Sequence, residues 1–393
     1  MYAFLWRQYA GLSDELKTAS NDLAVYRNTG EALLRGELPY RDFFIEYPPG
    51  SVPAFVPPAL FTETPLGYSN FLAHQMSLML VAALALVALT AWKIRGDWSW
   101  AAPAAAFAAG TALLYPVAVT RFDPTVSLSL AVAAFFVALG GRYILLGYAS
   151  LGFGAAAKLV PALATLPMAL LARRAGGGLR RAITGFAVFF AVLGAFFVPS
   201  YLIGSDRFIE SFTYHANRGL QLESVATSVL LKLGWIQGIS FEYGAWDVSG
   251  RGVDLMSALS LPITGALLLV TSAVMYKDYR AGRFGAGKFP RYAAALILAF
   301  IIGSKVLSPQ YMLWLLPLVP LAAGGLMGLG VSVVFLTACW ATTQIFPTYY
   351  GDLMDLEPTA VNLLLFRNLL LVVLWILMLF LPEDSPSSPK GKS

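Results

Sequence analysis

Several apolar runs in this chain are long enough to cross a lipid bilayer, and they constrain its fold more than any other feature. A transmembrane helix needs about 20 predominantly apolar residues. Hydrophobic residues make up 58% of the chain and charged residues 12%, about half the charged fraction of a soluble protein. We therefore predict an all-α, polytopic helical membrane protein. The clearest runs are 71–92, 182–203, 258–276, 326–346 and 365–381.

The basic residues fix an expected orientation for these runs. Lys and Arg cluster in short connections at 93–95, 173–181 and 277–291, which the positive-inside tendency assigns to the cytoplasm. The topology that follows has about eleven membrane segments, some of them short or broken. The net charge of +5 then reflects orientation in the membrane, and we expect no nucleic-acid partner. The predicted parts are an extracytoplasmic first loop (1–69), a membrane core (70–382) with outer loops 120–124, 204–257 and 347–364, and a disordered cytoplasmic tail (383–393).

Two pairs of short apolar segments, interrupted by Gly or Pro, meet at lysines. One pair meets near Lys158, and the pair 292–304 and 309–323 meets at Lys305. Half-length segments occur in membranes only where they are buried in protein or line a cavity. Each lysine alone could extend to the lipid headgroups. The repetition favours a cavity, because ionisable residues inside membranes are costly and usually functional.

The first 69 residues contain no spanning run, and residues 1–12 are too short to form one. The pattern of a secretory signal peptide is also missing. Either the run 71–92 carries the preceding segment outward, or the start of the protein lies upstream and an initial span precedes Met1. We favour the second explanation.

Polar residues gather in four clusters within the expected outer loops. A carboxylate in such a cluster can take a proton from an attacking hydroxyl, and Arg, Lys or protonated His can stabilise a phosphate leaving group. Tyr47 and Trp314 offer faces on which a sugar can stack. The clusters are Asp22, Tyr26, Arg27, Arg41, Asp42, Glu46 and Tyr47; Arg121 and Asp123; His215, Arg218, Gln221, Glu223 and Ser224; and Lys305, Ser308, Gln310 and Tyr311 with Trp314 one turn later.

Simpler explanations exist for several of these features. Asp22 follows Ser-Asn before an apolar stretch and could cap a helix. Arg121 and Asp123 could form an interfacial ion pair with each other. The Tyr-Pro-Pro-Gly sequence at 47–50 could serve only to turn the chain. The stripe 208–235 could be a helix lying on the membrane surface.

Signatures of soluble enzymes are missing. The sequence has no Walker-type phosphate loop, no H-E-x-x-H and no G-x-G-x-x-G after a strand, which disfavours a nucleotide-sugar donor from the cytosol. The single Cys339 lies in an apolar run, so one chain can form neither a disulfide nor a cysteine metal site. No compact ligand spacing demands a metal, although carboxylates are available for one. We expect no cofactor other than a lipid-linked sugar as co-substrate.

Six motifs in this order resemble the GT-C membrane glycosyltransferases, and most of all glycosyltransferase family 87, the polyprenyl-phosphate-mannose-dependent mannosyltransferases. The motifs are D-L-A-V-Y at 22–26, G-E-L-P-Y-R-D-F-F-I-E-Y-P-P at 36–49, R-F-D at 121–123, K-L-V-P at 158–161, R-G-L-Q-L-E-S at 218–224 and S-P-Q-Y-M-L-W-L-L-P at 308–317. The resemblance implies a polyprenyl-phosphate donor, an extracytoplasmic site, inversion at the anomeric carbon and an aspartate base. Asp22 matches that base. The span that precedes it in the family is missing here, so Asp42 is the second candidate.

The sequence thus predicts a multi-pass membrane enzyme that transfers a hexose, mannose being one candidate, to a lipid or cell-envelope glycan. Asp22 is the expected base, and Arg41, Lys158, Arg218 and Lys305 are candidates for holding the lipid phosphate. Membrane lipids are the other expected partners. A secondary transporter or lipid flippase is the main alternative, since broken helices with ionisable residues also occur there. A non-catalytic membrane scaffold is the second alternative. The remaining expected substrate-binding residues are Glu46, Tyr47, Arg121, Asp123, His215, Gln221, Glu223, Gln310 and Tyr311.

Overall fold

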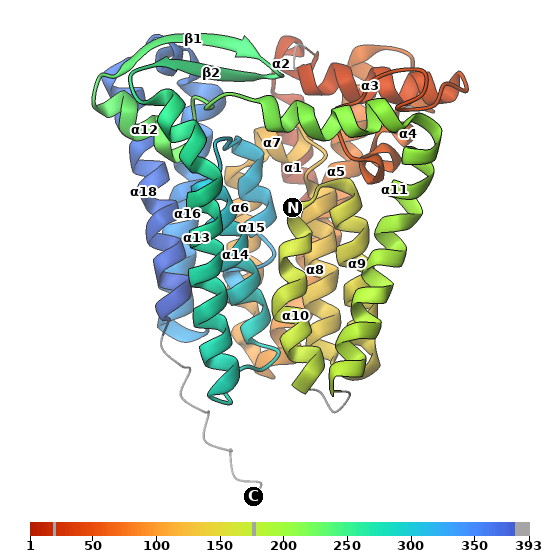
Figure 1. The fold of residues 1–393 in the computed structure, drawn as a ribbon, viewed down its shortest axis with the longest axis vertical. Helices are drawn as coiled ribbons and strands as arrows, with labels where there is room; N and C mark the ends of the chain where they lie inside the picture. The colour runs from red at the N-terminus through yellow and green to blue at the C-terminus, as the bar shows by residue number, and fades with distance from the viewer. Residues whose placement is uncertain (19–20, 175–177, 382–393) are drawn as a thin grey trace, which may run out of the picture.

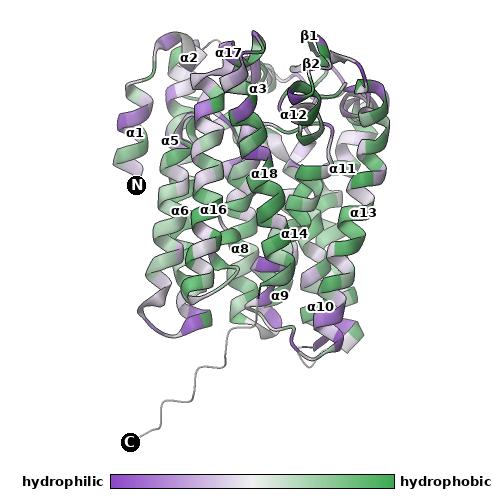
Figure 2. Cartoon of the chain, turned by 90° about the vertical axis from the view of Figure 1, so that its left-hand side faces the viewer, coloured by the Kyte–Doolittle hydropathy of each residue, from purple (hydrophilic) through white to green (hydrophobic). Residues whose placement is uncertain are grey.

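Long helices run side by side as a bundle in the computed structural model, which describes residues 1–18, 21–174 and 178–381 (Figure 1). Five of the described helices are long and apolar enough to cross a membrane. Hydrophobic residues cover the length of the bundle in Figure 2, with hydrophilic residues mainly at its two ends. The prediction of a polytopic helical membrane protein is confirmed, while the number of crossings stays a prediction. The five spans are α5 (Pro65–Arg95), α11 (Gly178–Asn217), α13 (Val253–Arg280), α16 with its π-helical end (Gly325–Thr348) and α18 (Pro358–Phe380).

Shorter helices fill the bundle between these spans, and two of the turns between them carry the lysines singled out by the sequence. Lys158 follows the end of α9 and is separated by one residue from the 3₁₀ turn Val160–Ala164, and Lys305 lies two residues beyond the end of α14. Both lysines therefore lie where two short segments meet. These shorter elements are α6 (Ala101–Leu113), α7 (Tyr115–Thr120), α8 (Pro124–Leu139), α9 (Ile144–Ala157), α10 (Thr165–Ala172), α14 (Lys288–Gly303) and α15 (Met312–Leu315).

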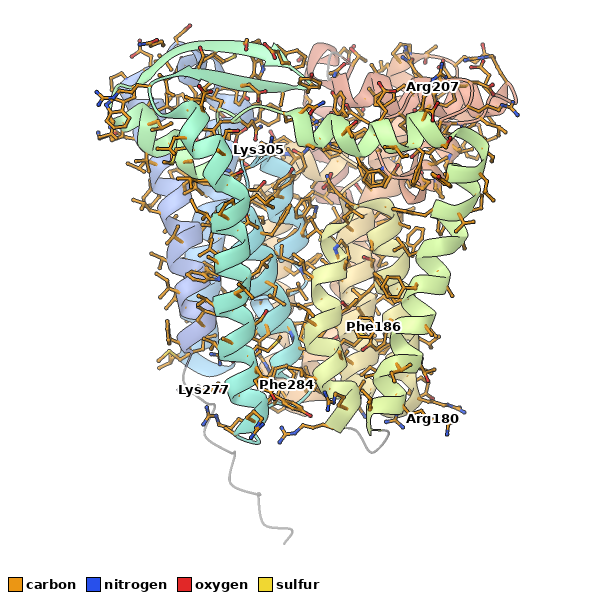
Figure 3. The ribbon with its side chains drawn as sticks, in the orientation of Figure 1. Arg180, Phe186, Arg207, Lys277, Phe284 and Lys305 are labelled. Atoms are coloured by element: carbon orange, nitrogen blue, oxygen red, sulfur yellow. The ribbon has the colours of Figure 1, made fainter. Side chains whose placement is uncertain are left out.

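A layer of short elements covers one end of the bundle, drawn at the top of Figure 1. We call it the upper layer. Arg207 and Lys305 lie at this end, whereas Arg180 and Lys277 lie at the opposite, lower end (Figure 3). The upper layer consists of α2 (Asp14–Thr18), α3 (Asn21–Leu34), α4 (Val52–Ala59), the part of α11 beyond Gly204, α12 (Val225–Lys232), the strands β1 (Ile236–Glu242) and β2 (Ala245–Gly250), and α17 (Tyr350–Met354).

The helix α11 bends sharply at Gly204, where φ is −153° and ψ is 64°. Its upper part then runs across the top of the bundle in Figure 1. A Cβ at Gly204 would overlap the carbonyl oxygen of Tyr40, so the bend lets the first loop pack directly beneath the helix. Tyr40 itself has a φ of 66°, which is unfavourable for a bulky residue, and its hydroxyl donates to the carbonyl oxygen of Tyr47 at 2.6 Å.

The segment 208–235 forms two helices rather than one surface helix, because α11 ends at Asn217 and α12 begins at Val225. An antiparallel hairpin of β1 and β2 follows, which the all-α prediction did not include. Its two-residue turn has positive φ at both Tyr243 (48°) and Gly244 (70°), which suits the twist of a hairpin. The hairpin packs with α12 and α18 through buried Leu230, Val248 and other apolar residues.

The N-terminal helix α1 (Tyr2–Ala10) packs against α5 and α7 below the upper layer. Leu5 and Tyr9 are fully buried in the main core of the bundle. Figure 2 shows α1 descending beside α5 from the level of α2. The expected tail 383–393 lies outside the described residues.

Candidate active site

A cavity of about 870 Å³ lies where the upper layer meets the bundle. Most residues that the sequence predicts for the site line it, although they come from six separate stretches of the chain. The tertiary structure thus brings together clusters that are almost 300 positions apart in sequence. The predicted residues in the cavity wall are Asp22, Glu46, Tyr47, Arg121, Lys158, His215, Arg218, Gln221, Glu223, Lys305, Gln310 and Tyr311.

Asp22 lies in the first turn of α3 and points to Arg121, which follows α7. Arg121 Nε is 2.7 Å from Asp22 Oδ2, and the Tyr47 hydroxyl donates to Asp22 Oδ1 at 3.1 Å. A carboxylate in the first turn also suits the positive end of the helix dipole. The Asp22 side chain thus contacts residues of the cavity wall, and these contacts orient its carboxylate toward the cavity.

Asp123 lies behind the cavity wall and is fully buried. Its Oδ1 accepts hydrogen bonds from Lys158 Nζ at 2.8 Å and from Trp314 Nε1 at 2.7 Å. The ammonium of Lys158 also lies 5.0 Å from the Trp314 ring, 5.5 Å from the Tyr311 ring and 5.2 Å from the Phe122 ring. Cations favour such positions over aromatic faces. The suggested pairing of Arg121 with Asp123 is therefore wrong, because each pairs with a residue from another part of the chain.

The motif that contains Glu46 packs closely against α9 at Gly50, which has no side chain. A Cβ at Gly50 would overlap the backbone of Ala156 and Ala157, immediately before Lys158. The Tyr-Pro-Pro-Gly sequence therefore does more than turn the chain, since it allows the first loop to approach the end of α9.

Glu46 is mostly buried and faces the upper part of α11. Burial raises the pKa of the Glu46 carboxyl, and a hydrogen bond with Tyr214 and the nearby charge of Arg218 oppose that rise. His215 Nε2 donates to the Glu46 carbonyl oxygen at 2.9 Å. Arg218 Nε donates to the carbonyl oxygen of Tyr243 in the hairpin turn at 3.1 Å, so the hairpin orients this guanidinium.

Lys305 and Gln221 join two segments that meet at the cavity. Lys305 Nζ donates to the carbonyl oxygen of Ala216 at 2.7 Å, and the Gln221 backbone N–H donates to that of Lys305 at 2.9 Å. The Gln221 side chain accepts from Leu307 N–H at 2.6 Å. These bonds hold Lys305 close to the end of α11, next to Arg218. Within the described residues, neither Lys305 nor Arg218 forms an ion pair.

Arg41 and Asp42 do not line the cavity. They pair with each other at 2.8 Å on the surface of the upper layer, and the Leu38 N–H donates to Asp42 Oδ2 at 2.7 Å. The hydrogen bond from Arg41 lowers the pKa of the Asp42 carboxyl. Arg207 Nη1 donates to the carbonyl oxygen of Arg41 at 2.9 Å, which ties this pair to the outer side of α11. The geometry therefore separates Asp42 from Asp22, the other candidate for the base.

The sequence analysis missed Arg367, which is fully buried in α18 and lies 3.3 Å from Glu223 Oε2. The available signal was an arginine within the apolar run 365–381, because intramembrane ionisable residues usually mark functional sites. Within the described part of the chain, no three His, Cys, Asp or Glu residues are arranged to hold a metal ion.

The sequence model of glycosyltransferase family 87 matches residues 44–309, which is more than half of the chain. The chain belongs to glycosyltransferase family 87. The recognition of this GT-C family from the sequence motifs is confirmed. The matched segment includes the cavity residues from Glu46 to Lys305. Asp22 lies before the start of the matched segment.

Among solved structures, ArnT from Cupriavidus metallidurans in the apo state is similar, with 14% sequence identity and a TM-score of 0.49 over 92% of this chain and 72% of that one. No curated protein sequence matches the chain significantly.

Proposed function

We propose that this membrane glycosyltransferase transfers a hexose, with mannose as the first candidate, from a polyprenyl phosphate to a hydroxyl group of a lipid or cell-envelope glycan. The observation that carries the proposal is the cavity itself, which combines carboxylates and cations where the upper layer meets the bundle. Leu159, Val160, Phe300 and Phe346 add an apolar part to its wall, which suits a polyprenyl chain.

Asp22 is the proposed general base. The acceptor oxygen attacks the anomeric carbon from the face opposite the phosphate while its proton passes to Asp22, so the configuration inverts. The bond between the anomeric carbon and the phosphate oxygen breaks, and that oxygen keeps the electron pair. Arg121 and Tyr47 hold the Asp22 carboxylate in place for this step. Asp42 is the weaker candidate, because it lies outside the cavity and is bound to Arg41.

The lipid phosphate gains one negative charge as this bond breaks, and cations stabilise that charge. Among the four candidates, Arg41 lies outside the cavity and Lys158 is offset by Asp123. Arg218 and Lys305 line the cavity and have no ion-pair partner in the described part of the chain. We assign the phosphate to these two residues.

The upper end of the bundle is the proposed extracytoplasmic end. Arg180 and Lys277 lie at the lower end (Figure 3), and clusters of basic residues favour the cytoplasmic side of a membrane. The donor and acceptor would then meet at the outer surface of the cell membrane.

The test is transfer of radiolabelled mannose from polyprenyl-phosphate mannose by the purified protein in lipid. We expect Asp22→Asn to lower the rate by about 10²-fold or more, since a positioned base contributes about that factor. Asp42→Asn is the matched control and should stay near the wild-type rate.

A wild-type rate in Asp22→Asn would contradict the assigned base. If wild type transfers no sugar, also with glucose or arabinose donors, the proposed donor class is wrong. Counterflow of substrate into liposomes without a covalent product would then support a transporter.

A further inference from the structure

Glu223, a buried carboxylate besides Glu46, faces the cavity on the side opposite Asp22. Glu223 lies between α11 and α12, whereas Asp22 belongs to α3, and Figure 1 shows α12 and α3 at opposite sides of the upper layer. Glu223 is 1% exposed and lines the cavity, while Arg367 behind it is not exposed at all. The cavity therefore has two separate acidic ends, one at Asp22 and one at Glu223.

The helix α18 fixes this corner through several hydrogen bonds. Arg367 Nη2 donates to the Glu223 carbonyl oxygen at 3.1 Å and lies 3.3 Å from its Oε2. Asn368 Nδ2 is bonded to the carbonyl oxygens of Glu223 at 3.3 Å and Ser224 at 3.2 Å. Ser224 in turn caps α12 by accepting from Thr227 N–H at 3.1 Å. The backbone at Glu223 is therefore anchored to α18, and the contact of Arg367 Nη2 with Oε2 directs the carboxylate.

A buried arginine at this place is expensive if its role is only structural. Replacing a buried ion pair with apolar residues is often neutral or stabilising, because desolvation offsets the attraction between the charges. Arg367 also leaves Nε and Nη1 buried without a hydrogen-bond partner among the described residues. Such a group within a membrane helix, directly behind a residue of a substrate cavity, points to a role in function.

We propose that Arg367 is a positioning residue that favours the ionised form of Glu223, which accepts hydrogen bonds from sugar hydroxyl groups. This inference rests on the proposed function and adds a sugar subsite separate from Asp22 and Arg121. Carboxylates suit this task because an ionised carboxylate offers acceptor positions on both oxygens, and hydrogen bonds to a charged group are strong. Arg367 does not line the cavity, so it acts through Glu223.

The charge state of Glu223 depends on few neighbours. Arg367 from α18 and Tyr350 from α17 are the charged and titratable groups that face it. Burial raises the pKa of the Glu223 carboxyl to about 7, and the positive charge of Arg367 limits that rise. Removal of the positive charge would raise this pKa further, and Glu223 would then be protonated at neutral pH.

The test compares Arg367→Met, Arg367→Lys and Glu223→Gln with wild type in kcat, in KM for donor and acceptor, and in the pH profile. At neutral pH we expect Arg367→Met to raise the KM of a sugar substrate by about 10- to 100-fold, as for loss of hydrogen bonds to a charged group. The acid limb of its pH profile should move upward by about one to three units. Arg367→Lys should keep KM and the pH profile close to those of wild type. Glu223→Gln should remove the acid limb of the pH profile.

The substrate whose KM rises identifies the source of the hydroxyl groups, which is either the donor or the acceptor. Lys232→Gln is the control, since Lys232 is exposed on α12 and its Nζ contacts Asn362. A folded Arg367→Met variant with wild-type KM values and pH profile would overturn the proposal. Should this variant not fold, Glu223→Gln carries the test, and wild-type KM values with an unchanged pH profile in that variant would overturn the proposal.

An infrared titration of the Glu223 carboxylate, taken as the difference between wild type and Glu223→Gln, needs no substrate. This titration tests the role of Arg367 independently of the proposed glycosyl transfer. A carboxylate pKa that is the same in wild type and Arg367→Lys but higher in Arg367→Met supports the role of Arg367, even where no sugar is transferred. A pKa that does not respond to loss of the charge overturns it.

Discussion

The four basic side chains that line the cavity differ in how their charge is offset. Arg121 lies 2.7 Å from Asp22 and Lys158 lies 2.8 Å from Asp123, so each is already paired. Arg218 donates to the carbonyl oxygen of Tyr243 and is also hydrogen-bonded with Tyr214, and Lys305 donates to the carbonyl oxygen of Ala216, while neither forms an ion pair within the described residues. A cation without a carboxylate partner can interact fully with an incoming phosphate.

We therefore expect Arg218→Gln and Lys305→Gln each to lower kcat/KM by about 10- to 100-fold, the range for one hydrogen bond to a charged group. Both variants should also become less sensitive to inhibition by free polyprenyl phosphate. Kinetics with this product as inhibitor checks the prediction, with Arg251→Gln as control because Arg251 lies over Trp235, outside the cavity. Unchanged inhibition in both variants would contradict it.

Asp123 illustrates a residue whose importance follows from its partners. Asp123→Asn leaves the Lys158 ammonium among aromatic rings without a counter-charge, and removal of one partner from a buried pair is strongly destabilising. We expect a loss of about 2–3 kcal/mol of unfolding free energy, below the value for a fully buried pair because Lys158 is partly exposed to the cavity.

Thermal unfolding in detergent measures this loss. The double variant Asp123→Asn with Lys158→Met should recover part of it, because both charges are then absent. Asp42→Asn should leave the unfolding temperature unchanged, since that carboxylate lies on the surface. Equal effects of the single and the double variant would argue against the pair as the cause.

At the scale of elements, the bend in α11 connects this helix to Asp22, the proposed base. The backbone of Tyr40 occupies the space where a Cβ of Gly204 would lie. The Tyr40 hydroxyl donates a hydrogen bond to the carbonyl oxygen of Tyr47. The Tyr47 hydroxyl in turn donates to Asp22 Oδ1. A displacement at Gly204 therefore reaches the Asp22 carboxylate through two hydrogen bonds.

Gly204→Ala should destabilise the protein by about 1–3 kcal/mol, the usual cost of forcing extra atoms into a packed site. It should also lower kcat, because Asp22 loses its orientation. Unfolding temperature and transfer rate are the two measurements. Gly265→Ala on α13 is the matched control, as no atom lies within 4 Å of the added Cβ, and it should leave stability unchanged or slightly higher. If both variants behave alike, the close approach to Tyr40 has no consequence.

At the scale of the whole molecule, the orientation in the membrane can be measured directly. The single cysteine, Cys339, is buried, so a membrane-impermeant maleimide has little background reaction. We expect Glu242→Cys in the hairpin to be labelled in intact cells. Lys277→Cys at the lower end should be labelled only after the membrane is permeabilised (Figure 3). The reverse pattern would place the cavity on the cytoplasmic side.

Most residues of the candidate site could be selected from the sequence, because they combine charge with an unusual place in the chain. Lys158 and Lys305 interrupt apolar segments, and Asp22, Glu46 and Glu223 lie in short polar stretches beside such segments. Ionisable residues within or beside apolar segments are costly in a membrane, so such positions indicate residues with a function. Arg367 had the same signal but was counted within a span, since a single charge hardly changes the mean hydropathy of a long run.

The sequence alone determined that this protein crosses the membrane and belongs to a family of glycosyltransferases. Transfer into hydrocarbon depends on the composition of contiguous stretches, which a sequence displays directly. Only the tertiary structure decided which charges meet. Arg121 pairs with Asp22 rather than Asp123, and Asp42 lies outside the cavity while Asp22 lies in its wall. Such pairings depend on distances between segments far apart in the chain, and these distances follow from close packing such as that of the Tyr40 backbone against Gly204.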